Sequence, residues 1–256
     1  MFVTCENPEP AGGILLALSV SDGRVLWQKK YKLTPYRSHN DNSYATATPA
    51  VVAERVYVLW QTSNETIIAG LDHNGRELWQ RTFPGINSRF GPGTSPMLFD
   101  DIVVFTHEQW EGGKGGAGIQ LSAVRPGSED NPGQVTLAYK HNGKTAPYVS
   151  TSLAKDGLLF TFHDQGDVSC LRIETGEVLW SERPGGRFYG SPVWVNDLLY
   201  CINRQGEVLV LKEAPAYELP DVNPLGEKSQ ATPAVAGDRM YLRTYSHLIS
   251  IGGRMQ

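Results

Sequence analysis

The stretch "GRVLWQ" at residues 23–28 returns as "GRELWQ" at residues 75–80 and as "GEVLW" at residues 176–180. A polar residue precedes each copy, and a polar residue followed by glycine favours a tight turn because glycine adopts positive φ without strain. The three turns are Asp22-Gly23, Asn74-Gly75 and Thr175-Gly176. A tryptophan follows each glycine at the same distance, at Trp27, Trp79 and Trp180. We predict that the motif is a strand–turn–strand hairpin and that these rings occupy equivalent, largely buried positions between repeats.

A second pattern begins with a small hydroxyl residue and continues through two short apolar runs that a polar pair separates. It reads "TPAVVAERVYVLW" from Thr48, "SPMLFDDIVVFTH" from Ser95, "SLAKDGLLFTFHD" from Ser152, "SPVWVNDLLYCIN" from Ser191 and "TPAVAGDRMYLRT" from Thr232. The polar pairs favour two-residue hairpins. The second residues lie at positions 49, 96, 153, 192 and 233, and a recurrence of roughly 45 residues is typical of four-stranded propeller blades.

The two patterns together predict an all-β chain that folds as a β-propeller of four-stranded antiparallel blades. The first letters, "MFVTCEN", match a second strand, and the last regular stretch, "HLISIGG", matches a third. We therefore expect one propeller domain at residues 1–256 with about six blade positions, the first and last incomplete. A missing N-terminal segment would supply strand D of the last blade and strand A of the first. The tryptophan is absent from two blades: Leu137 follows Gly133 in one, and "YELPDVNPL" replaces the motif in the other.

Composition argues against several classes of protein. The net charge is −4 and no basic stripe is present, so no nucleic-acid partner is expected. The longest apolar run, near residues 14–20, is far shorter than the roughly 20 residues of a membrane-spanning helix. No signal peptide is visible. The three cysteines, Cys5, Cys170 and Cys201, form no C-x-x-C pair, which favours buried hydrophobes over metal ligands or a redox pair.

The Ser/Thr-Pro strands and the "x-G-x-x-L-W" hairpins resemble the pyrroloquinoline-quinone-type (PQQ-like) propeller repeat over nearly the whole chain. The resemblance is closest to non-catalytic, propeller-only members, among them a lipoprotein of outer-membrane assembly, and it implies a periplasmic or otherwise extracytoplasmic location. Quinoprotein dehydrogenases of the family hold the quinone with a calcium ion and an adjacent cysteine pair in a longer, eight-bladed chain. This sequence has no adjacent cysteines. We therefore expect no PQQ or other cofactor and no metal, and we assign no catalytic residue.

Polar residues gather in the segments expected to join strand D of one blade to strand A of the next. In a propeller these connections and the B–C loops lie at one mouth of the channel, where ligands usually bind. Nearly every connection carries a cation, which favours a small anionic or sugar-like ligand or a protein segment. The candidate ligand-binding residues are Arg37, His39, Asp41, Arg89, Tyr148, Arg187, Tyr189 and Lys228. The alternative is that they only cap loops and face water.

The leading hypothesis is a non-catalytic binding or scaffold protein of the bacterial cell envelope, with its ligand or partner at this mouth. Arg89 and Arg187 are the strongest candidates for an anion because the guanidinium group forks onto a carboxylate or phosphate. His39 and Asp41 alone are too few to predict a metal site. Two alternatives stay open: a quinone- or metal-dependent oxidoreductase, and a carbohydrate-binding propeller.

Overall fold

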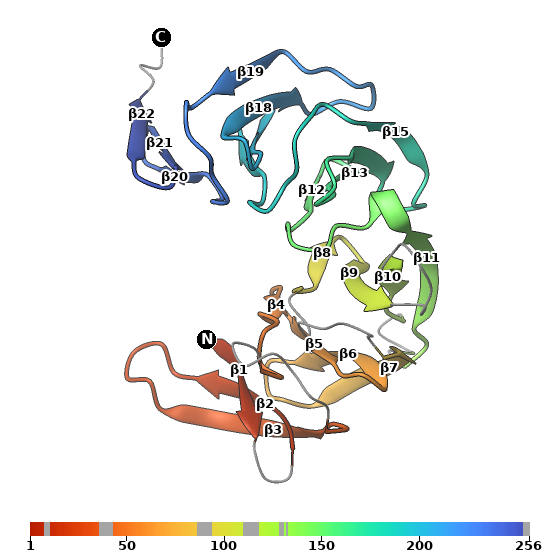
Figure 1. Ribbon diagram of the computed structural model, residues 1–256. Coiled ribbons are helices and arrows are strands. Elements are labelled where there is room, and N and C mark those ends of the chain that lie inside the picture. The colour runs from red at the N-terminus through yellow and green to blue at the C-terminus, as the bar shows by residue number, and fades with distance from the viewer. Residues whose placement is uncertain are drawn as a thin grey trace. The chain divides into compact units, whose positions relative to one another are not determined.

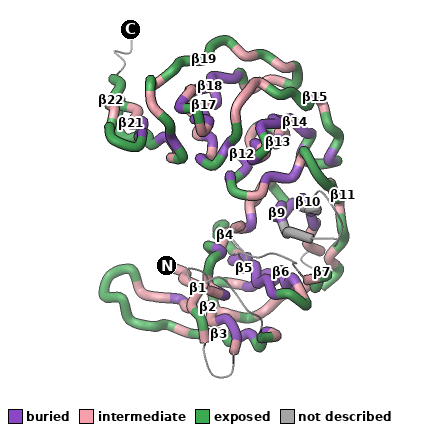
Figure 2. The backbone as a smooth tube through the Cα atoms, viewed as in Figure 1, coloured by how far each residue is buried: buried purple, intermediate pink, exposed green. Residues whose placement is uncertain are grey.

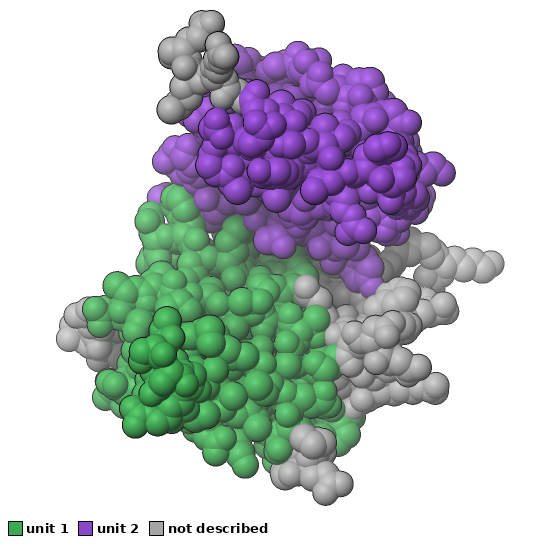
Figure 3. All heavy atoms as spheres, turned by 90° about the vertical axis from the view of Figure 1, so that its left-hand side faces the viewer, with its two compact units in different colours: residues 1–143 green, residues 144–256 purple. Residues whose placement is uncertain are grey.

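The computed structural model describes residues 1–7, 11–35, 43–85, 94–109, 118–127, 131 and 133–252. Within these residues the chain is all-β and forms six antiparallel sheets (Figure 1). Each sheet is a meander in which strands consecutive in the sequence pair with one another. This is the structure of propeller blades, so we number the sheets as blades 1 to 6 in chain order. The two compact units of the chain are Met1–Gly143, with blades 1 to 3, and Lys144–Gln256, with blades 4 to 6 (Figure 3).

The first unit begins with a three-stranded blade, as predicted. Blade 1 consists of β1 (Phe2–Asn7), β2 (Gly12–Leu18) and β3 (Val25–Lys32). Blade 2 consists of β4 (Ala50–Val51), β5 (Arg55–Gln61), β6 (Glu65–Asp72) and β7 (Glu77–Pro84). Blade 3 consists of β8 (Met97–Phe99), β9 (Ile102–Gln109), β10 (Gly118–Arg125) and β11 (Thr136–Asn142). A single 3₁₀ turn, η1 (Gly143–Thr145), follows β11.

The second unit ends with a three-stranded blade, also as predicted. Blade 4 consists of β12 (Leu153–Lys155), β13 (Leu158–Phe162), β14 (Val168–Arg172) and β15 (Val178–Glu182). Blade 5 consists of β16 (Val193–Val195), β17 (Leu198–Ile202), β18 (Glu207–Lys212) and β19 (Asp221–Pro224). Blade 6 consists of β20 (Ala234–Ala236), β21 (Arg239–Arg243) and β22 (Leu248–Gly252).

The hairpins lie where the turn residues of the sequence predicted them. In the A–B hairpin of blade 4, Asp156 and Gly157 have φ of 48° and 79°, and Lys155 pairs with Leu158 across the two-residue loop. Positive φ at both central residues is the backbone of a type I′ hairpin, which matches the right-handed twist of the strands. All three glycines of the opening motif also have positive φ: Gly23, Gly75 and Gly176.

The tryptophans occupy one position in the blade repeat. Each pairs across the C–D hairpin with a small residue, and a β-bulge follows directly in all three cases. The pairs are Ala17 with Trp27, Gly70 with Trp79, and Cys170 with Trp180. A small residue opposite leaves room for the indole to lie across the strand: a Cβ on Gly70 would come within 2.5 Å of Trp79 Nε1.

Burial of the tryptophans is as predicted for two of the three. Trp79 and Trp180 are 3% and 8% exposed, whereas Trp27 is only half-buried. The Trp27 ring lies over Gly75, and its Nε1 donates a hydrogen bond to the carbonyl of His73, 2.8 Å away. It therefore contacts the C–D turn of the next blade, and it is less buried than the other two rings.

Two details of the repeat are corrected. In blade 3 the tryptophan position is held by Tyr139, which pairs with Ala123 beside a β-bulge, while Leu137 is 41% exposed. Because the C–D connection of that blade is longer, the aromatic residue follows Gly133 by six positions and not by four. In blade 4 the leading hydroxyl residue is Thr151, one residue before the predicted Ser152. Its amide donates to Ser191 Oγ at 2.9 Å.

The leading hydroxyls have a structural role that the sequence did not reveal. Three of them, Ser95, Ser191 and Thr232, accept a hydrogen bond from the backbone amide at the same position of the preceding blade, at 2.9 Å. The donor–acceptor pairs are Thr48 with Ser95, Thr151 with Ser191, and Ser191 with Thr232. These bonds connect strand A of neighbouring blades.

The core lies between blades, and buried residues concentrate on the middle strands of each sheet (Figure 2). Blades 4 and 5 share a cluster of ten buried side chains, which includes Phe160 and Trp180. Blades 5 and 6 share only three: Ile202, Val208 and Leu242. Packing is therefore much sparser at the last interface of the second unit.

Candidate functional site on the loop face of blades 4 to 6

The B–C turns and D–A connections of the second unit lie together at one end of its sheets. The connection between blades 4 and 5 touches the B–C turns of both: Arg183 Nη2 donates to Gln165 O at 2.6 Å, and Arg204 N donates to Arg187 O at 2.8 Å. The next connection is held in the same way. We call this surface the loop face; it consists of residues 163–167, 183–192, 203–206, 225–233 and 244–247.

A repeated turn sequence explains how connection and turn come so close. Gly166 and Gly206 follow glutamines in "QGD" and "QGE" and have φ of 105° and 84°. A Cβ on Gly166 would stand 2.1 Å from Gly186 O, and one on Gly206 would stand 1.7 Å from Glu227 O. Only glycine lets the backbones approach this closely. The repeated Gln-Gly-acid turn is the sequence signal from which this approach could have been predicted.

The acidic side chains of the loop face, and the adjoining Glu207, have local partners. Asp167, 8% exposed in its side chain, lies 3.5 Å from Lys144 Nζ. Asp164 Oδ2 accepts a hydrogen bond from Gln165 Nε2 at 2.9 Å. Glu207 Oε2 accepts one from Asn203 Nδ2 at 2.6 Å. These carboxylates thus serve to order the turns.

Glu227 is the most strongly satisfied of the acids. Ser246 Oγ donates to Glu227 Oε1 at 2.6 Å, Ser246 N donates to Oε2 at 3.1 Å, and the Thr244 hydroxyl also donates to Oε2. Because these hydrogen bonds favour the charged form, with that from the Ser246 hydroxyl the largest contribution, the pKa of Glu227 falls to about 2. His247 Nδ1 lies 3.4 Å from Glu227 Oε2. The cluster fastens the B–C turn of blade 6 to the preceding connection.

The basic side chains are placed differently. Arg187 and Lys228 are exposed, and within the described residues neither side chain has an ion pair or hydrogen bond. Arg204 lies with its guanidinium carbon 4.6 Å from the ring centroid of Tyr189, a cation–π arrangement that orients the group. The loop face therefore presents cations to solvent while its acids are held by local donors.

The other predicted site residues differ in where the structure places them. Tyr148 is half-buried and Tyr189 is exposed. Lys144, the cation of the connection between blades 3 and 4, is engaged with Asp167. Arg37, His39, Asp41 and Arg89 lie outside the described residues.

Among the residues that the structure describes, no three His, Cys, Asp or Glu side chains gather in a way that could hold a metal ion. The three thiols are free and lie on separate strands, β1, β14 and β17. Burial raises the pKa of Cys170 to about 12 and raises that of Cys201 as well. The cysteines therefore do not fit the adjacent pair of a quinoprotein site. No helix in the described part of the chain is long and apolar enough to cross a membrane.

Comparison with protein families gives one match: the family model described as outer membrane protein assembly factor BamB covers residues 7–113 and 121–253. No curated protein matches the sequence. Among solved structures, BamB from Moraxella catarrhalis is similar with a TM-score of 0.61 and 15% identity, over 93% of this chain and 66% of that one. The chain thus spans less than two thirds of that protein's length.

Two dehydrogenases have the same fold. A europium-containing methanol dehydrogenase matches with a TM-score of 0.59 and 15% identity, over 88% of this chain and 49% of the enzyme. A quinohemoprotein alcohol dehydrogenase from Pseudomonas putida HK5 matches with a TM-score of 0.55 and 14% identity, over 83% and 39%. At such identities the likeness shows the β-propeller fold, and chemistry has to be argued from this chain's own residues.

Proposed function

The chain belongs to the family of the outer membrane protein assembly factor BamB, and from this premise we propose that it is a non-catalytic propeller scaffold of the bacterial cell envelope. Its loop face binds an acidic segment of a partner protein. The observation that carries the proposal is the division of charge on this face: Arg187 and Lys228 are exposed, while Asp167 and Glu227 are held by local donors.

Two features support a carboxylate as the group recognised. An arginine fork matches a carboxylate with two parallel hydrogen bonds. Arg204 is oriented over Tyr189, so less side-chain freedom is lost when it binds.

The test is a titration of the whole protein with a fluorescein-labelled hexaglutamate peptide at low and high salt. We expect weak, salt-sensitive binding that the double substitution Arg187→Ala, Lys228→Ala reduces about tenfold, the loss of roughly 1.4 kcal/mol. Arg172→Ala is the matched control, because Arg172 is also exposed, pairs with Glu177 at 3.2 Å, and lies beside the C–D turn at the opposite end of blade 4. Equal binding by parent and double variant would remove the loop face as the site.

The propeller fold shared with two dehydrogenases leaves a quinone-dependent oxidoreductase as the alternative to be tested. Addition of PQQ with calcium, followed by dye reduction with alcohols, distinguishes it from the scaffold. Stoichiometric binding with turnover would refute the non-catalytic interpretation. A glycan array tests the carbohydrate-binding alternative in the same way.

A further inference from the structure

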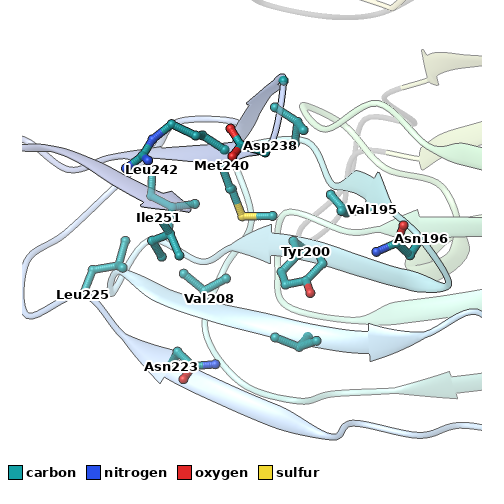
Figure 4. A pocket seen from close by; sticks show the side chains of 14 residues that line it. Val195, Asn196, Tyr200, Val208, Asn223, Leu225, Asp238, Met240, Leu242 and Ile251 are labelled. Carbon is teal, nitrogen blue, oxygen red and sulfur yellow. The ribbon is translucent and has the colours of Figure 1, made fainter. Parts of the chain in front are cut away.

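An opening in the second unit lies between blades 5 and 6 and meets the edge of the loop face at Leu225. It is a cavity of about 860 Å³, within the range of roughly 300–1,000 Å³ that small-molecule sites occupy. Figure 4 shows its walls: Tyr200 and Val208 come from blade 5, and Met240, Leu242 and Ile251 come from blade 6. The walls are mostly aliphatic, with one aromatic ring.

The repeat explains why this cavity exists. At the equivalent interface between blades 4 and 5, Trp180 and Trp194 both pack near Phe160, with ring centroids 6.0 and 6.1 Å from it. Strand pairing places Asp221 in blade 5 where Trp180 stands in blade 4. It places Val235 in blade 6 where Trp194 stands in blade 5. Neither Asp221, which is exposed, nor Val235 brings an indole ring to this interface. Tyr200 occupies the position equivalent to Phe160.

The polar groups at the cavity define the ligand further. Asp238 and Arg239 stand side by side on its wall, so their charges balance and favour an uncharged ligand. Arg239 Nε already donates to Ser250 Oγ at 2.6 Å. The side chains of Asn223 and Asp238 have no hydrogen bond within the described residues, and both offer oxygen acceptors to a ligand N–H or O–H.

We propose that the cavity between blades 5 and 6 is a binding site for a neutral aromatic molecule of two fused rings that carries a hydrogen-bond donor. The rings take the volume that Trp180 and Trp194 fill one interface earlier and pack against Tyr200. Apolar cavities left by missing side chains bind aromatic molecules of matching size. The exposed cations Arg187 and Lys228 of the loop face do not line this cavity, so the site does not depend on the proposed acidic partner.

The probe is 2-naphthol, titrated into the whole protein with methyl-¹³C methionine. Its ring current should shift the Met240 methyl signal, since Met240 lines the cavity, and leave Met97 of blade 3 unmoved. 2-Naphthoate, which has the same rings with a charge, should bind at least about tenfold more weakly. No shift of Met240, equal shifts of both methionines, or equal affinity for naphthoate would overturn the assignment.

A second experiment fills the cavity. The double substitution Asp221→Trp, Val235→Trp restores both rings and should weaken 2-naphthol binding by about tenfold or more. Val222→Trp adds an indole on the same strand at a residue that does not line the cavity, and it should bind as the parent does. Unchanged affinity in the double variant refutes the proposal. If that variant does not fold, the Met240 shift in the parent decides.

Discussion

Replacement of Trp180 by alanine tests whether these rings hold blades together. Trp180 is 8% exposed, lies with its ring centroid 5.2 Å from that of Tyr217, and donates from Nε1 to the carbonyl of Ala214 at 3.2 Å. A buried tryptophan removes about 200 Å² from water, worth about 5 kcal/mol at ~25 cal/mol/Å². That value is an upper bound because the unfolded chain already hides part of this surface. We therefore expect Trp180→Ala to lower the free energy of unfolding by ~3–5 kcal/mol.

The difference between tryptophans makes the prediction sharper. Trp27 is less buried than Trp180, so Trp27→Ala should lower the free energy of unfolding by less, about 2 kcal/mol. The surface control is Val178→Ala on the same strand as Trp180, where the side chain is 40% exposed and the change should be ~0.5 kcal/mol. Urea unfolding followed by circular dichroism and fluorescence measures these values, provided the two transitions coincide. A loss below ~1 kcal/mol for Trp180→Ala, or a larger loss for Trp27→Ala, would refute the argument from burial.

Three further predictions rest on individual contacts. Glu227→Gln should lower the melting temperature at neutral pH. This difference should disappear as pH falls from about 4.5 toward 2, because the hydrogen bonds that lower the pKa of Glu227 stabilise the fold only while the carboxylate is charged. A difference that does not change with pH would contradict this. Thr232→Val removes the acceptor of the Ser191 amide and should speed hydrogen exchange at that amide, with a stability loss of ~1 kcal/mol; unchanged exchange would show that the bond is not formed. Ellman's reagent should label one thiol, Cys5, in the native protein, since burial raises the pKa of Cys170 and Cys201; labelling of all three without denaturant would show that the blades open readily.

Turn chemistry made the blade order predictable from sequence. Glycine and Asp/Asn-Gly pairs fix local backbone geometry, so the hairpins at Asp156-Gly157 and Thr175-Gly176 could be predicted from the sequence alone. The alignment of equivalent residues between blades was harder to predict from the sequence. The leading hydroxyl of blade 4 was predicted one residue too late, at Ser152 instead of Thr151, because serine and threonine occupy three successive positions there. Only the hydrogen bond to Ser191 identifies the equivalent hydroxyl.

The charge pattern of the loop face shows a second limit of sequence reasoning. Lys144, Arg187 and Lys228 look alike in sequence as cations of successive D–A connections. Their difference is tertiary, since Lys144 meets Asp167 from a different turn, whereas Arg187 and Lys228 are exposed. An ion pair between residues remote in sequence depends on which turn lies beside which connection, and the sequence does not state this.

The two ends of a blade carry different physical tasks, and this accounts for where the sequence repeats. At the C–D end, Trp27 and Trp180 each donate to a backbone carbonyl in the next blade, so the glycine turn and the ring must recur together wherever blades dock by this contact. At the B–C end, only the close backbone approach at Gly166 and Gly206 is fixed, and the flanking side chains are free to differ. A scaffold can therefore change what its loop face binds without disturbing its docking, since each blade packs mainly against its neighbours. The interface between blades 5 and 6 departs from this rule: Asp221 has replaced the docking ring, and the volume left behind becomes available to a ligand.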